Sequence, residues 1–206
     1  MNFTEWEPHY REIIEYFGFD RAADEEAARL LASLLKRDNL LSLASLTHGN
    51  EVTVCGNAPC LKDEIGKITG IVFAADAAAE VLDAHGICPD AIFTDLDGTT
   101  DRIIELNKEG TIIVIHAHGD NMPLLNHWVP RFKGNVVGTT QAAPLPRVYN
   151  FGGFTDGDRA AFAADELGAS SIILVGFDLD DENVEPMKRG KLIWARKLLA
   201  LIGLTA

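Results

Sequence analysis

Short apolar runs alternate with stretches of helical spacing from residue 51 onward, and this alternation limits the folds that the chain can adopt. We expect strands at 51–55, 70–75, 90–94, 111–117, 135–138 and 170–176. The intervening segments 77–86, 101–110 and 158–169 carry apolar residues at helical spacing. Strands and helices in short alternation are typical of a mostly parallel sheet with helices on both faces. The sequence therefore predicts a three-layer α/β fold.

Residues 1–50 lack this alternation and predict a small helical segment that precedes the sheet. Thr4 and Glu7 have the spacing of a capping box, and Gly18 ends the apolar periodicity of the first helix. We expect this segment to form a lid, a brace or an oligomer surface, which leaves a homo-oligomer open. Residues 51–206 are expected to form the α/β catalytic domain.

The charge of the chain excludes several classes of partner. Its 18 Lys and Arg residues against 31 Asp and Glu residues give a formal net charge of −13, which repels nucleic-acid phosphates and anionic membrane surfaces. No apolar run approaches the roughly 20 residues of a membrane helix, and the first residues lack a signal-peptide layout. We therefore expect a cytoplasmic protein with small-molecule substrates, no nucleic-acid partner and no membrane partner. Lys188, Arg189 and Lys191 could contact an anionic substrate, but a solvated basic face is the preferred interpretation.

Polar residues follow most of the expected strands. They are Gly56, Asn57, Asp76, Asp95, Asp97, His118, Asp120, Thr139, Thr140 and Gln141. Parallel sheets bind ligands just beyond the carboxyl ends of their strands, and those ends meet at one edge. We therefore expect these side chains to form one site.

Asp95 and Asp97 carry the most weight among them, because they follow one strand with a single residue between them. A helix N-cap needs only one Asp, and two carboxylates this close repel each other unless a cation lies near. Magnesium prefers one or two carboxylates, with water and phosphate oxygens completing its coordination. We expect Asp95 and Asp97 to bind a metal ion, and Asp76 to be either a third ligand or the cap of the next helix.

Two further strand ends have a functional and an ordinary interpretation. Gly56 and Asn57 predict a tight loop whose backbone N–H groups contact a nucleotide or phosphate, but an ordinary turn has the same composition and no Walker motif follows. His116 and His118 would face the same side of a strand. Packing or a local hydrogen bond is the alternative for His116, while His118 lies beside Asp120 in a turn at the sheet edge.

A glycine-rich loop is predicted to lead into the helix at 158–169. Thr155 and Asp158 have capping-box spacing, which explains those two residues structurally. Backbone N–H groups at a helix start, together with a guanidinium, favour an anion. We therefore expect ligand contacts at this helix start from Gly153, Asp156 and Arg159.

Three enzyme classes place paired Asp residues after a strand. In haloacid-dehalogenase-type phosphatases Asp95 would be the nucleophile, but that residue normally follows the first strand, and here two expected strands precede it. In metal-dependent glycosyltransferases Asp95 and Asp97 would bind a nucleotide sugar, and in pyrophosphokinases they would bind Mg²⁺ beneath ATP. A non-catalytic nucleotide-binding module also stays open.

Five segments together closely resemble the archaeal-type 6-hydroxymethyl-7,8-dihydropterin pyrophosphokinase family. They are CGNAPCL, ADAAAEVLDAHGICPDAIFTDLDG, HAHGDN, GTTQ and NFGGFTDGDRAAFAADELGA, and the resemblance covers nearly the whole chain. The resemblance implies a 2-amino-4-hydroxy-6-hydroxymethyldihydropteridine diphosphokinase that transfers diphosphate from ATP to the pterin and releases AMP. It also implies a place in folate or tetrahydromethanopterin biosynthesis. The layout is similar to thiamine pyrophosphokinases too, but Phe154 stands where that family has an Arg, which argues against thiamine.

The activity that this resemblance implies requires a polyanion to be positioned and its charge neutralised, which carboxylates achieve by holding Mg²⁺. We expect Asp95 and Asp97 to bind Mg²⁺, assisted by Asp76 or Asp120. His118 or Asp120 would orient or deprotonate the hydroxymethyl group. The expected contacts to ATP are Gly56, Asn57, Asp76, Thr139, Thr140, Gln141, Gly153, Asp156 and Arg159.

Overall fold

Seven parallel strands form one sheet at the centre of the molecule, in the spatial order β6-β5-β4-β3-β2-β1-β7. The structure is a computed structural model and describes residues 1–205. The strands are β1 Glu51–Cys55, β2 Ile71–Ala75, β3 Ala91–Thr94, β4 Ile112–Ala117, β5 Val136–Thr140, β6 Val148–Tyr149 and β7 Ser171–Val175. The expected α/β class is confirmed. The short strand β6 was not expected, because two residues are too few to give a periodic pattern.

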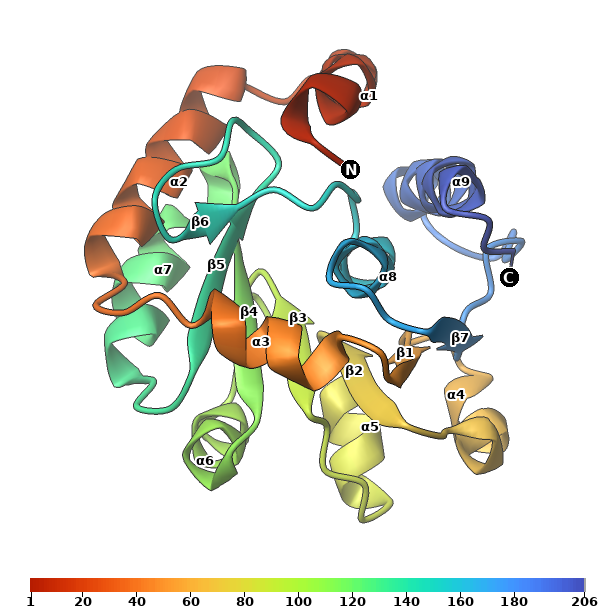
Figure 1. Cartoon of the computed structure of the whole chain (residues 1–206). Coiled ribbons are helices and arrows are strands. Elements are labelled where there is room, and N and C mark those ends of the chain that lie inside the picture. The colour runs from red at the N-terminus through yellow and green to blue at the C-terminus, as the bar shows by residue number, and fades with distance from the viewer. Residues whose placement is uncertain (206) are drawn as a thin grey trace.

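Helices cover both faces of the sheet (Figure 1). They are α1 Phe3–Phe17, α2 Arg21–Leu34, α3 Leu40–Thr47, α4 Leu61–Glu64, α5 Ala78–Ala84, α6 Asp101–Glu109, α7 Met122–Trp128, α8 Asp156–Glu166 and α9 Pro186–Leu201. Alternate strand side chains point to opposite faces. Val54 and Phe93 share a core with α1, α3, α8 and α9, whereas Ala74 and Ile113 share a core with α2, α4, α5, α6 and α7. Within residues 1–205, no helix combines the length and apolar character needed to cross a bilayer.

The N-terminal helices are part of both cores. Helix α1 contributes Trp6 and Tyr10 to the core that contains α8 and α9, and α2 contributes Ala27 and Leu31 to the opposite core. All four side chains are fully buried. Burial of a large apolar side chain contributes about 1.5–3 kcal/mol. The segment is therefore held firmly against the sheet that it precedes.

The expected capping box at Thr4 and Glu7 is wrong, because α1 begins earlier. Asn2 is the N-cap: its side chain accepts the N–H of Glu5 at 3.1 Å, and the Glu5 carboxylate accepts the N–H of Asn2 at 3.0 Å. Asn is at least as good a cap as Thr, and the earlier start brings more backbone groups into the helix. The helix ends as expected at Gly18, which has a φ of 73°.

The strand order reverses beside β1, and this reversal opens a crevice at the carboxyl edge of the sheet. Strands β1 to β6 follow one another across the sheet, and the chain then returns to pair β7 with the other side of β1. Parallel sheets bind ligands at such switch points. Gly56 and Gly176 let the two strand ends approach closely, since a Cβ on Gly56 would lie 2.6 Å from the carbonyl oxygen of Gly176.

Candidate active site

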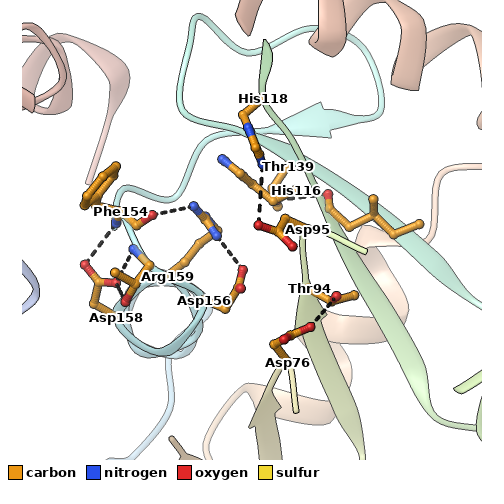
Figure 2. A network of polar contacts seen from close by, with 12 residues as sticks. Asp76, Thr94, Asp95, His116, His118, Thr139, Phe154, Asp156, Asp158 and Arg159 are labelled. Carbon is orange, nitrogen blue, oxygen red and sulfur yellow. Dashed lines mark hydrogen bonds and ion pairs between the residues drawn. The ribbon is translucent and has the colours of Figure 1, made fainter. Parts of the chain in front are cut away.

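Three carboxylates gather where β2 and β3 end. Asp76 follows β2, and Asp95 and Asp97 follow β3. Each offers one oxygen, and the three oxygens lie within 4.8 Å of one another. Figure 2 shows Asp76 and Asp95 at neighbouring strand ends with Thr94 between them, and the Thr94 hydroxyl donates to Asp76 at 2.9 Å. We call Asp76, Asp95 and Asp97 the acidic cluster.

Two unusual backbone conformations hold the acidic cluster. Asp76, with a φ of 45°, and Leu96, with a φ of 76°, lie in the left-handed region that residues with a side chain rarely adopt. Leu96 is fully buried, and its N–H donates to the Thr94 hydroxyl at 2.9 Å, so the turn between Asp95 and Asp97 is fixed from inside. Strained conformations of this kind cost about 1–3 kcal/mol each and are found mainly at functional sites.

The three carboxylates differ in how readily they ionise. Burial and the charges of Asp97 and Asp95 raise the pKa of Asp76, although the hydrogen bond from Thr94 opposes this. Burial and the charge of Asp95 raise the pKa of Asp97. Burial also opposes ionisation of Asp95, but hydrogen bonds from His118 and from the Asp97 backbone outweigh it and lower the Asp95 pKa to about 2. A cation near the cluster would offset the mutual repulsion of these groups.

His118, in the turn after β4, has a partner at each ring nitrogen. Its Nδ1 accepts the backbone N–H of Asp120 at 3.4 Å, and its Nε2 lies 3.4 Å from the Asp95 carboxylate. A neutral imidazole that accepts at Nδ1 carries its proton on Nε2, so His118 donates to Asp95. Asn121 fixes the same turn by donating to the carbonyls of Asp95 and His116 at 2.8 and 2.7 Å. His118 therefore orients Asp95, while Asp120 is exposed nearby.

The loop before α8 brings a buried arginine to the site. Thr155 and Asp158 form the expected capping box, and the Asp158 carboxylate also accepts the N–H of Phe154 at 2.9 Å. Arg159 is 5% exposed and donates to Asp156 at 2.7 Å and to the Phe154 carbonyl at 2.8 Å (Figure 2). Burial raises the pKa of Asp156 even with the Arg159 guanidinium beside it. The N–H groups of this helix start and the nearby Arg159 suit an anionic group.

A cavity of about 350 Å³ opens on one side of the acidic cluster, and Asp95 borders it. His116 and His118 line it from β4 and the following turn, and Arg159 lines it from α8. Asp24 of α2 lies on its N-terminal side, together with the turn between α1 and α2. The N-terminal helices therefore form one wall of this cavity, which we call the smaller cavity.

Asp24 connects that wall to the strand ends. Its carboxylate accepts three hydrogen bonds, from the Tyr10 hydroxyl at 2.8 Å, the Gln141 side chain at 2.7 Å and the Gly119 N–H at 2.8 Å. The Trp6 indole adds a fourth connection by donating to the Gln141 carbonyl at 2.8 Å. Asp24 is only 3% exposed. The network holds the loop after β4 against α2.

A larger cavity of about 570 Å³ lies at the switch point between β1 and β7. Gly56 and Asn57 line it from the end of β1, and Phe177 lines it from the end of β7. Lys188 and Lys191 line it from α9, and Lys191 also borders the smaller cavity. Asp76 borders this larger cavity, so the acidic cluster lies between the two.

Known proteins with similar sequences identify the family. A family described as 6-hydroxymethylpterin diphosphokinase MptE-like matches residues 25–184. The chain belongs to this family. Relatives named 6-hydroxymethyl-7,8-dihydropterin pyrophosphokinase include one from Methanothermobacter thermautotrophicus, which is 38% identical over 97% of this chain and 94% of the relative. Another, from Pyrococcus furiosus, is 44% identical over 86% of this chain and 78% of the relative.

One solved structure with a detectable match is less similar in sequence than the MptE-like relatives. The MAf glycosyltransferase from Magnetospirillum magneticum AMB-1 matches 72% of this chain and 28% of its own, with 18% identity and a TM-score of 0.43. Similarity at this level carries no argument about function. The family assignment therefore rests on sequence.

The structure brings most of the expected site residues to the two cavities. The lining residues among them are Gly56, Asn57, Asp76, Asp95, His118, Asp120, Gln141, Asp156 and Arg159. Asp97 belongs to the acidic cluster but lines neither cavity, and Thr139, Thr140 and Gly153 support the lining from behind. Thr139 and Thr140 are buried in β5, where the Thr139 hydroxyl lies 3.2 Å from His116. Gly153 packs on α8, since a Cβ there would lie 2.5 Å from the Cα of Arg159.

Several residues that line the cavities were not among the expected site residues, and the polar ones include Asp24, His116 and Lys191. Asp24 had a readable signal, because it lies at helical spacing with the buried Ala27 and Leu31 and is therefore a carboxylate on an apolar stripe. His116 had packing as its alternative interpretation, and Lys191 was assigned to a solvated face. The position of Lys191 depends on how α9 packs, which no local pattern reports.

The acidic cluster fits a magnesium ion by its chemistry. Carboxylate oxygens are the donors that Mg²⁺ prefers, and it keeps further positions for water and substrate phosphates. Asp97 is exposed, and cavities border Asp95 and Asp76, so the cluster is open to ligands. Asp76, Asp95 and Asp97 are therefore the residues that would hold such an ion.

Proposed function

We propose that this protein transfers diphosphate from ATP to the hydroxymethyl group of 6-hydroxymethyl-7,8-dihydropterin and releases AMP, with Mg²⁺ as the metal. This is the activity of a 2-amino-4-hydroxy-6-hydroxymethyldihydropteridine diphosphokinase, in folate- or methanopterin-type cofactor synthesis. The names of the relatives support the substrate. The observation that carries the proposal is the acidic cluster between two cavities, one for each substrate.

The larger cavity is assigned to ATP. ATP is the larger substrate, and the cavity lies at the switch point where parallel sheets bind nucleotides. Gly56 and Gly157 leave room for the Phe177 ring, since a Cβ on either would lie 3.0 or 2.9 Å from it, and the partly exposed ring offers an aromatic face to the base. Lys188 and Lys191 supply positive charge for the phosphates in a protein that is otherwise acidic.

The smaller cavity is assigned to the pterin. Its volume of about 350 Å³ suits a bicyclic ring system. Its lining includes buried polar groups from His116, Gln141 and Arg159, which can meet the ring nitrogens and oxygen. A pterin in this cavity would have its hydroxymethyl group close to Asp95, on the side from which ATP phosphates reach the cluster.

The reaction forms a bond between the hydroxymethyl oxygen and the β-phosphorus and breaks the bond between that phosphorus and the oxygen that stays with AMP. Mg²⁺ held by the acidic cluster would neutralise phosphate charge as it shifts to the leaving group. His118 keeps Asp95 oriented through its Nε2–H. Both ring nitrogens of His118 have partners, so we assign proton acceptance from the hydroxymethyl group to the exposed Asp120. Arg159 stabilises negative charge beside the start of α8.

The test is to incubate the protein with Mg²⁺, ATP and 6-hydroxymethyl-7,8-dihydropterin and to resolve the nucleotides. We expect AMP and a pterin diphosphate in equal amounts, with no product after chelation of the metal. Thiamine in place of the pterin should give no AMP. Release of ADP or free phosphate, or hydrolysis of a nucleotide sugar without AMP formation from ATP, would contradict the proposal.

A further inference from the structure

His116 is a buried histidine that the reaction steps above leave without a role. It lies near the end of β4, is 2% exposed and lines the smaller cavity. Its Nδ1 lies 3.2 Å from the Thr139 hydroxyl, whereas its Nε2 has no hydrogen-bond partner within residues 1–205. Buried polar atoms without a partner are rare in native proteins and require an explanation.

The hydrogen bonds around Thr139 decide which nitrogen of His116 carries the proton. A threonine hydroxyl has one hydrogen, and we assign that of Thr139 to the Ile115 carbonyl at 3.0 Å, which is nearer than the His116 Nδ1 at 3.2 Å. The hydroxyl oxygen can then only accept from His116, so Nδ1 is protonated and Nε2 keeps a lone pair. Burial and the charge of Arg159 lower the pKa of His116 well below its usual value, which keeps the ring neutral.

Arg159 provides a second unpartnered group in the same cavity. Figure 2 shows Thr139 on one side of the His116 ring and Arg159 on the other. The terminal nitrogens of Arg159 donate to Asp156 and Phe154, but within residues 1–205 its buried Nε–H has no acceptor. Two residues that line the cavity therefore carry buried unpartnered atoms, an acceptor on His116 and a donor on Arg159. A neutral heterocycle with both N–H groups and acceptor atoms can satisfy both.

We propose that His116 determines which substrate enters the smaller cavity, by accepting at Nε2 a hydrogen bond from an N–H or O–H of the pterin. This inference rests on the proposed function, which assigns the pterin to this cavity. A dihydropterin carries ring N–H groups, an amino group and a hydroxyl, so it has hydrogens to donate. An ionised phosphate oxygen has none, and a bare lone pair repels it. His116 thus favours the heterocycle over the polyphosphate, with Thr139 as the residue that positions its proton.

Two substitutions of His116 test the roles of its two ring nitrogens separately. His116→Asn keeps an N–H near the position of Nδ1, for Thr139, but removes the acceptor at the position of Nε2. His116→Gln can place a carbonyl oxygen near the position of Nε2 instead. We expect KM for the pterin to rise about tenfold or more in His116→Asn, because a buried donor of the substrate is left unsatisfied. KM for ATP should stay within about twofold, and His116→Gln should recover part of the loss.

A measurement on the unsubstituted protein keeps the inference testable if either variant fails to fold. Nitrogen-15 NMR of the histidine rings should show His116 protonated at Nδ1 and unprotonated at Nε2. Adding the pterin should shift the Nε2 resonance toward the range of a hydrogen-bonded nitrogen. A proton on Nε2 in the free protein, or no shift with saturating pterin, would overturn the inference.

The kinetic outcomes distinguish this inference from the proposed function. If the unsubstituted protein forms AMP from ATP and pterin but His116→Asn has an unchanged pterin KM, the role of His116 is wrong and the proposed function stands. If the unsubstituted protein forms no AMP with the pterin, the proposed function is wrong, and the inference loses the ligand on which it rests.

Discussion

Asp24 and the acidic cluster are carboxylate groups at the same edge of the sheet, with opposite hydrogen-bond environments. Three donors converge on the single Asp24 carboxylate. The three carboxylates of the acidic cluster receive hydrogen bonds from Thr94, the Asp97 N–H and His118, and backbone contacts from Ala77 and Gly98, which is fewer than two donors for each carboxylate. A structural carboxylate such as Asp24 is supplied with several hydrogen-bond donors, whereas the carboxylates that we propose to bind a ligand have fewer donors each.

The two regions also differ in what surrounds the charge. Asp24 lies between two helices and a loop, where its donors come from elements far apart in the sequence. The acidic cluster comes from two neighbouring strand ends and lies between the two cavities. Neutralising one carboxylate should therefore cost mainly stability at Asp24 and mainly activity at the cluster.

Replacing Asp97 by Asn should give the largest effect, a fall in kcat of about 10³-fold, because it removes a proposed metal ligand and a charge beside the proposed phosphate site. The free energy of unfolding without metal should stay the same or rise, since burial and the charge of Asp95 raise the pKa of Asp97, and a neutral amide removes both penalties. Steady-state AMP formation and urea unfolding of the same preparation check both expectations.

Asp95→Asn should lose activity to a similar extent but also lose about 1 kcal/mol of stability, because the His118 hydrogen bond favours the charged form of Asp95. Asp101→Asn is a matched control, since Asp101 is an exposed carboxylate in the first turn of α6. Near-normal turnover in the Asp95 and Asp97 variants would remove the metal assignment.

Asp24→Asn should lower stability more than activity, which is the opposite of the effect that we expect at the acidic cluster. An amide offers one acceptor oxygen where the carboxylate offers two, so a buried donor loses its partner and the free energy of unfolding should fall by about 2 kcal/mol. Urea unfolding measures this loss. The rise in melting temperature caused by Mg²⁺ should persist, because the acidic cluster is intact.

Tyr10→Phe gives a graded comparison for Asp24→Asn, since it removes one of the three donors and leaves the carboxylate. A loss of about 1 kcal/mol or less is expected. If Asp24→Asn abolished the Mg²⁺ effect while unfolding normally, Asp24 would belong with the ligand-binding carboxylates, and the comparison would fail.

The sequence predicts most clearly what depends on neighbouring residues. Six of the seven strands differ by no more than two residues at either end from the runs expected for them, because buried parallel strands are short apolar runs. Asp95 and Asp97 stand out because two carboxylates one residue apart at a strand end need an explanation. The Thr155 and Asp158 capping box is likewise local and is confirmed.

What the sequence does not predict depends on packing between distant segments. Asp24 reaches Gly119 across 95 residues, and the contribution of Lys191 depends on the path of α9. Thr4 was predicted as the cap of α1 in place of Asn2, and residue type alone does not separate them because both serve as caps. The tautomer of His116 follows from the Thr139 hydroxyl, which lies on the next strand and is visible only in three dimensions.

The smallest effect predicted for the acidic cluster is its response to pH. The pKa values of Asp76 and Asp97 are raised in the folded protein, so the folded state binds more protons than the unfolded state between the ordinary Asp pKa and the raised values. The stability that these groups contribute without metal is present at low pH and is lost as pH rises through the raised values. Asp95 is ionised throughout this window and does not contribute to the change.

Mg²⁺ competes with protons for the same carboxylates, so its stabilising effect should grow as pH rises through that window. The rise in melting temperature at saturating Mg²⁺ should be larger at pH 7.5 than at pH 4.5 by about 2–4 °C, equivalent to about 1 kcal/mol. NaCl of equal ionic strength is the control for screening, and Asp97→Asn should remove most of the difference. An equal rise at both pH values would mean that the ion binds elsewhere, and the contrast with Asp24 would then rest on hydrogen-bond geometry alone.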